Sequence, residues 1–128
     1  MATGFPASTG DVLSAAMFNG LVTFTLNDQS GATYTVANTD LYQALVRTTN
    51  ASTKTVTIAP DSTLTSAAVG STITFLNSGA GTLTFAAGAG VTITSAGATS
   101  AAPTLGQYKT AVAIRTAANA WTIAGAIS

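Results

Sequence analysis

The sequence predicts an all-β fold, an antiparallel β-sandwich of the jelly-roll type with a short N-terminal arm and helix in front of it. Thr-x-Thr recurs seven times around an apolar or aromatic residue. This alternation sends the apolar side chains to one face of a strand and the threonines to the other. Turn-forming residues separate the expected strands at intervals of roughly 8–12 residues, which is typical of sandwiches. Helical patterns are too scarce for β-α-β units.

The first twenty residues differ from the rest, so we divide the chain into an arm at 1–20 and a sandwich domain at 21–128. Residues 1–10 are small and turn-forming, which indicates an extended segment. Residues 11–19 could form a short helix that ends at Gly20, and such a helix gains its stability from what it packs on. It either packs on its own domain or anchors the chain to a neighbouring molecule. The expected anchoring residues are Val12, Leu13, Ala16, Met17 and Phe18.

Strands and turns follow from residue 21 onward. The expected strands span residues 21–27, 33–37, 44–49, 54–59, 71–77, 82–86, 91–95, 109–116 and 120–126. Residues 97–106 are expected to form a loop because small residues and Pro103 dominate them. Two Gly-Ala-Gly segments, at 79–81 and 88–90, are expected to be tight turns. A phosphate-binding loop would need a third glycine and a following helix, and both are missing.

Charge is scarce in this chain. Charged residues make up 6% of its 128 residues, where about a quarter is usual, while hydrophobic residues make up 47% and the formal net charge is zero. A free monomer with so little charge is poorly protected against association, so we expect a homo-oligomer, with a trimer as the first choice. The four basic residues are scattered, which argues against nucleic-acid binding.

The sequence contains no segment expected to cross a membrane, because no run of about 18 apolar residues is present. Its first residues also lack the basic and apolar regions of a secretory signal. We therefore expect no membrane partner and synthesis in a cytoplasm.

The residues needed for common catalytic chemistry are absent. The chain has no His, Cys or Glu, so the usual nucleophile–base pairs cannot be built, and we expect no enzyme, no catalytic residues and no cofactor. We also expect no metal site, because the four aspartates are at least 12 residues apart along the chain. Asp28 and Asp61 are interpreted as turn residues, and Asp40 has no obvious role. An ion pair between Arg47 and Asp40 is one interpretation of the arginine.

The large aromatic residues are expected to pack in the core or between subunits. This expectation covers Phe24, Phe75, Phe85 and Trp121. Stacking of Trp121 on a sugar is the functional alternative. Threonine ladders also occur on the flat solenoids of ice-binding proteins, but there the coils have constant length. Here the intervals between motif starts are 10, 22, 8, 9, 10 and 10 residues, which argues against such a ladder.

An ordered series of short motifs runs through most of the chain. In order they are Tyr34-Thr35, Asp40, Leu45-Val46, Asn50-Ala51-Ser52, Val56-Thr57-Ile58 with Pro60, Gly70 with Ile73, Gly79-Ala80-Gly81, Gly88-Ala89-Gly90-Val91-Thr92-Ile93, Gln107-Tyr108, and Trp121 with Gly125. Taken together, residues 21–126 resemble a β-domain common in the virion proteins of tailed bacteriophages. The arm segment Gly10–Ala16 is also similar to the opening of phage fibre-type proteins.

The resemblance implies a virion assembly protein, usually trimeric, that is made in the host cytoplasm and lies on the particle surface. A domain of this size that stands nearly alone looks like a capsid decoration, or cement, protein, whose partner would be the major capsid protein. A tail-fibre or head-fibre domain with a receptor-binding role is the second interpretation. A carbohydrate-binding module is the third.

Overall fold

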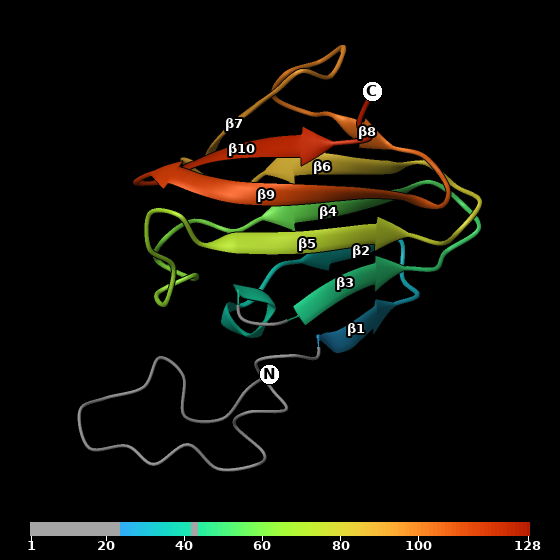
Figure 1. Cartoon of the computed structure of the whole chain (residues 1–128), viewed down its shortest axis with the longest axis horizontal. Coiled ribbons are helices and arrows are strands. Elements are labelled where there is room, and N and C mark those ends of the chain that lie inside the picture. The colour runs from blue at the N-terminus through green and yellow to red at the C-terminus, as the bar shows by residue number, and fades with distance from the viewer. Residues whose placement is uncertain (1–23, 42–43) are drawn as a thin grey trace.

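The computed structural model describes residues 24–41 and 44–128 of the chain (Figure 1). Two β-sheets face each other in this part. The strands are β1 (Thr25–Gln29), β2 (Thr33–Thr35), β3 (Ala44–Thr48), β4 (Lys54–Ile58), β5 (Thr72–Asn77), β6 (Leu83–Ala87), β7 (Thr92–Ser95), β8 (Thr104–Leu105), β9 (Lys109–Ala117) and β10 (Ala120–Gly125). A single turn of 3-10 helix, η1 (Asn38–Leu41), lies between β2 and β3.

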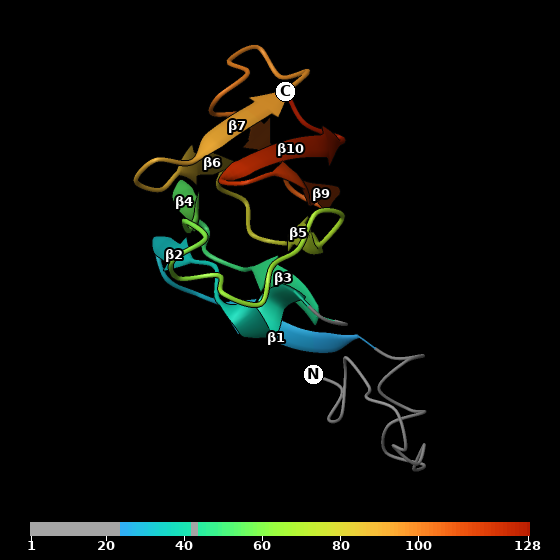
Figure 2. The same ribbon diagram turned by 90° about the vertical axis from the view of Figure 1, so that its left-hand side faces the viewer.

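The first six strands alternate between the two sheets, so that the chain winds in coils. Sheet A has the strand order β1-β3-β5-β9-β10-β7, and sheet B has the order β2-β4-β6-β8. Within sheet A, β3 runs parallel to β1 and β5, and within sheet B, β4 runs parallel to β2 and β6. Each pair of consecutive strands is therefore one coil, and three such coils stack. Figure 2 shows β2 and β4 on one side of the interior and β3 and β5 on the other.

The C-terminal strands complete both sheets with antiparallel pairs. Strand β9 is antiparallel to β5 and to β10, and β8 is antiparallel to β6. At the far edge of sheet A, β7 is parallel to β10. Both sheets are thus mixed: parallel coils form one end, and toward the other end sheet A carries the β9–β10 hairpin and sheet B the antiparallel strand β8.

The predicted antiparallel, jelly-roll-like sandwich is therefore wrong, although the fold is mostly β. Side chains alternate with period two in parallel and antiparallel strands alike, so the Thr-x-Thr pattern locates strands without specifying their partners. Parallel neighbours need a long crossover, and here a strand of the opposite sheet supplies it. The expected loop at 97–106 also contains the short strand β8. The expected N-terminal helix lies outside the described residues.

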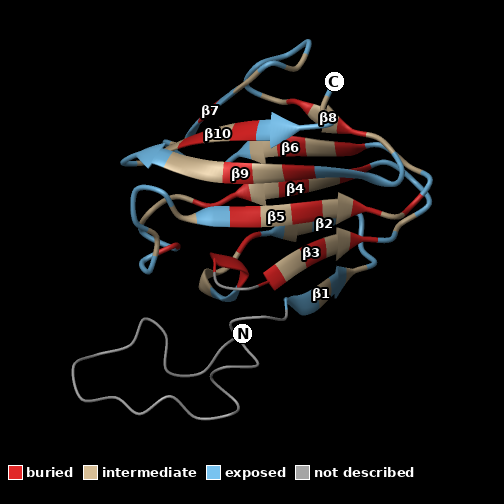
Figure 3. Ribbon diagram, in the orientation of Figure 1, coloured by how far each residue is buried: buried red, intermediate tan, exposed pale blue. Residues whose placement is uncertain are grey.

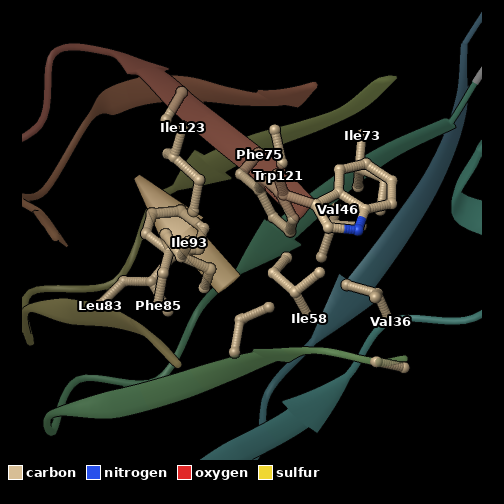
Figure 4. Close-up of a cluster of buried hydrophobic side chains, with 14 of the residues drawn as sticks. Val36, Val46, Ile58, Ile73, Phe75, Leu83, Phe85, Ile93, Trp121 and Ile123 are labelled. Atoms are coloured by element: carbon tan, nitrogen blue, oxygen red, sulfur yellow. The ribbon is translucent and has the colours of Figure 1, made fainter. Parts of the chain in front are cut away.

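The core fills the space between the sheets, where buried residues alternate along the inner strands such as β3, β4, β5 and β6 (Figures 3 and 4). The largest fully buried side chains are Trp121, Phe75, Phe85, Ile58, Leu64, Ile73, Leu83, Leu105, Ile123, Val36, Val46 and Val56. Burying each of the larger ones is worth about 1.5–3 kcal/mol. The third-coil strands β5 and β6 contribute Phe75 and Phe85, whose rings touch. The inner faces of both sheets are therefore buried in the core, and the two outer faces are available for contacts with other molecules.

Candidate functional site

The outer face of sheet B carries rows of threonine. One row crosses all four strands in register and consists of Thr33, Thr55, Thr84 and Thr104. A second row consists of Thr35, Thr57 and Ala86. The irregular sequence intervals do not prevent this stacking, because the connections between strands absorb the differences in coil length. We call these two rows the threonine face, and it presents hydroxyl and methyl groups without charge.

The outer face of sheet A mixes apolar side chains with the threonines Thr72, Thr74, Thr110 and Thr122. Leu26, Leu45, Leu76, Val112, Ile114 and Ala124 are at least partly exposed, and in β3, β5 and β9 they alternate with buried core residues. We call these six residues the apolar strip. One line of register partners crosses the sheet in the order Leu26, Leu45, Thr74, Val112 and Ala124. The side chain at the free end of this line, Leu26, is 49% exposed.

A shallow hollow indents the apolar strip. Its volume is about 210 Å³, and Thr74, Val112, Ala124 and Gly125 are among the residues that line it. Gly125 has φ 131° and lies close to the backbone of β9, where an added Cβ would come within 2.6 Å of the Thr110 carbonyl oxygen. Glycine at this position lets β10 lie close to β9, and the hollow beside it is a depression that a protruding side chain of another molecule could enter.

A buried carboxylate organises the first coil. Asp40 is 1% exposed, and its side chain accepts hydrogen bonds from Tyr34 Oη at 2.6 Å, Asn27 Nδ2 at 2.8 Å and the Ala37 amide at 2.9 Å. Burial, together with the hydrogen bond to Asp40, raises the pKa of Tyr34 to about 12. The phenol therefore stays protonated at neutral pH and serves as a donor rather than a nucleophile. A hollow of about 460 Å³ adjoins these side chains.

The expected pairing of Arg47 with Asp40 is wrong, because Arg47 pairs with Asp28 on the neighbouring strand. The guanidinium Nη2 lies 2.7 Å from Asp28 Oδ2, and both side chains are over one third exposed. This two-pronged hydrogen bond lowers the pKa of Asp28 below its ordinary value. The pair borders the apolar strip, and the opposite charges of Arg47 and Asp28 cancel each other there.

A second ion pair fastens the β9–β10 hairpin to the loop after β4. Arg115 Nη2 lies 2.6 Å from Asp61 Oδ2, and this oxygen also accepts a hydrogen bond from the Asn119 amide at 3.0 Å. Asn119 has φ 50°, a conformation that few residues adopt readily, and its side-chain oxygen accepts from the Asp61 amide at 2.8 Å. Asp61 is therefore a link between distant segments as well as the expected turn residue.

Lys54 has a structural role that the sequence did not indicate. It is 3% exposed, and its Nζ donates to the carbonyl oxygens of Asn50 at 2.6 Å and Gly81 at 2.9 Å. Burial lowers the pKa of this amine. Asn77 donates to the same Gly81 oxygen and to the Leu105 carbonyl. Lys54 thus ties the turn between β3 and β4 to the turn between β5 and β6, a structural use of its charge.

The described residues hold no group of three or more acids or other metal-binding side chains that could take up a metal ion. Among the same residues, η1 is too short to cross a membrane, and no long apolar helix occurs.

The aromatic residues singled out from sequence divide into buried and exposed ones. Phe75, Phe85 and Trp121 are at most 1% exposed, so the Trp121 ring is not available to stack on a sugar. Phe24 is 52% exposed, because it precedes β1 at the edge of sheet A, and it does not belong to the core. Tyr108, named from the sequence only as part of the Gln107-Tyr108 motif, is 75% exposed and has φ 59°. The five expected anchoring residues lie outside the described part of the chain.

Comparisons of the chain with protein-family models, with curated proteins and with solved structures return no match.

Proposed function

We propose that this chain is a structural protein of a tailed-phage virion that decorates the head shell as a homo-oligomer, a trimer in the simplest case. The observation that carries the proposal is the pair of outer sheet faces with little charge, of which one is covered with threonine and the other carries the apolar strip beside the self-paired Asp28 and Arg47. Surfaces of this kind gain free energy from contact with other protein surfaces rather than from transforming a small molecule. The ordered motifs that resemble phage virion β-domains support the same conclusion.

The action of such a protein is mechanical. Apolar area that is removed from water between the decoration protein and the shell stabilises the assembly by about 25 cal/mol per Å². An oligomer that contacts several capsid subunits holds more tightly than one copy could, because its later contacts form at a high effective concentration. The major capsid protein is the partner that this mechanism requires.

A second candidate function is a fibre domain on the tail or the head. Stacked coils favour it, because β1 and β2 are the edge strands of their sheets at the same end of the described stack. An open edge of this kind can pair with a further strand and extend the stack. In a fibre the chain would repeat or continue along the coil axis, whereas in a decoration protein it would spread over the shell.

Binding to capsids that lack the protein tests the proposal. Purified chain is mixed with undecorated shells of the phage that encodes it, and the shells are sedimented and imaged. Decoration predicts saturable co-sedimentation and added density at regular positions on the lattice. No binding to shells, combined with labelling of the tail in intact particles, would support the fibre function instead.

A further inference from the structure

We infer that copies of this chain contact one another through the apolar strip on the outer face of sheet A, while the threonine face of sheet B stays outside that contact. The inference names the surface behind the oligomer in the proposed function and rests on that function only for the existence of the oligomer.

The side chains on the two outer faces differ in how well they can hydrogen-bond to water. Threonine hydroxyls on sheet B can hydrogen-bond to solvent, so that face is stable when wet. The strip on sheet A has three leucines with Val112 and Ile114 beside them, and these side chains have no polar group to offer. Thr72 and Thr74 lie among them, so the face is mixed, but exposed apolar side chains that gather on one side of a soluble domain mark places where another surface binds.

The strip runs across the strands, which is the direction in which the coils stack. Its central line passes through β1, β3, β5, β9 and β10 in sheet order. Copies that lie side by side, with their stacks along a common direction, can therefore bring whole strips together. The hollow beside Gly125 then offers a place for a leucine of the neighbouring copy.

We infer a second copy of the chain as the partner, because its apolar strip has the same polarity as the strip it would contact. The charges that border it, Asp28 and Arg47, are already paired with each other, so a strongly charged partner would leave its own charges unmatched there. Another copy brings a surface of the same apolar kind and a net charge of zero. Two copies of the strip therefore match in charge and polarity without a bridging ion or ligand.

The size of the face is adequate for this contact. Strand spacing of about 4.8 Å makes the six strands of sheet A about 24 Å wide, and the six residues of β5 are about 20 Å long. The flat area is then about 480 Å² per copy, or about 960 Å² in total, which falls in the range of small, reversible interfaces.

Matched arginine substitutions test the inference. Val112→Arg places a charge in the apolar strip, and Thr57→Arg places one on the threonine face; both positions lie mid-strand and are half-buried. Sedimentation equilibrium should show an oligomer for the wild type and for Thr57→Arg. Val112→Arg should raise its dissociation constant by more than about tenfold, because the guanidinium would be buried without a partner. An oligomer that survives Val112→Arg, or that is lost in Thr57→Arg alone, would overturn the inference.

Single thiols decide the question if Val112→Arg fails to fold. The chain has no cysteine, so Thr74→Cys and Thr57→Cys each introduce one thiol with little change in volume. A short bismaleimide should link Thr74→Cys into covalent pairs at dilute concentration and leave Thr57→Cys unlinked. Equal linking, preferential linking through position 57, or a monomeric wild type would contradict the inference. An oligomer with this interface that ignores undecorated shells would leave the inference intact and remove the decoration function.

Discussion

Phe75 of β5 and Phe85 of β6 meet edge to face in the interior, with ring centroids 5.0 Å apart and ring planes at 72°. The two strands belong to opposite sheets and follow each other in the chain. The contact therefore joins the two halves of the third coil across the core.

Truncation of this pair should be costly. Phe85→Ala should lower the free energy of unfolding by about 3–5 kcal/mol, because a large buried ring leaves a cavity. A double-mutant cycle with Phe75→Leu and Phe85→Leu should give a coupling of about 0.5–1.5 kcal/mol for the edge-to-face contact. Urea denaturation measures both. Additive effects of the two leucine substitutions would show that the rings contribute only through their burial.

Trp121 should show two separable effects. Its side chain is 1% exposed, and its indole Nε1 has no hydrogen-bond partner. Trp121→Ala should destabilise the fold by about 3–5 kcal/mol through loss of volume. Trp121→Phe should cost clearly less, because it also removes a buried donor that folding leaves unsatisfied. Thermal and urea denaturation compare the two variants. A phenylalanine variant as unstable as the alanine one would mean that the nitrogen is satisfied in solution.

Acid should weaken the link between Asp61 and Arg115. Hydrogen bonds from the Arg115 guanidinium lower the pKa of Asp61 below its ordinary value of 3.8. The unfolded chain therefore binds a proton more readily than the folded one. The stabilisation is fully present above the unfolded pKa and is lost as pH falls through the folded one. Wild type should lose stability below about pH 4 more steeply than Asp61→Asn.

Asp28→Asn is the matched control for this pH dependence. The pKa of Asp28 is also lowered, by its hydrogen bond from Arg47, but both side chains of that pair are over one third exposed. Solvent weakens exposed pairs, so Asp28→Asn should flatten the acid limb less than Asp61→Asn does. Denaturant titrations between neutral pH and pH 3 measure how steeply the free energy of unfolding of each variant falls with pH. Equal slopes for wild type and Asp61→Asn would show that the Arg115 pair adds no acid sensitivity.

The N-terminal arm should serve attachment to the particle rather than the stability of the sandwich. Deleting residues 1–20 should leave the melting temperature nearly unchanged and abolish binding to undecorated shells. The substitutions Leu13→Ser and Met17→Ser should act in the same direction within the full chain, because they remove apolar groups expected on one helical face. If the truncated protein coats shells at wild-type occupancy, attachment comes from the sandwich itself.

Strand positions were predictable because alternation is a local property. Thr72-Ile73-Thr74 begins β5, with Ile73 buried and its neighbours turned outward. Pairing was not predictable, because the same alternation fits parallel and antiparallel partners. The threonine row shows the limit well: Thr55 and Thr84 are 29 residues apart in the chain yet lie in register, since the intervening loop and strand β5 take up the distance.

The polar contacts depend on the pairing and were therefore missed. Asp40 meets Asn27 only because β1 and η1 come together in the first coil. Lys54 becomes a buried tie because Gly81, from the next coil, lets the chain pass close by: a Cβ there would lie 1.9 Å from the Ser52 carbonyl oxygen. Neither relation has a local signature in the sequence. The low charge leads us to expect a surface that associates, but composition does not say which face would take part.

The copy number of this chain in purified virions tests the central claim most directly. Quantitative mass spectrometry of intact particles measures it against the major capsid protein. A decoration protein predicts many copies in a fixed ratio to that protein, and the same ratio in heads separated from tails. Absence of the chain from purified virions would contradict its assignment as a virion structural protein.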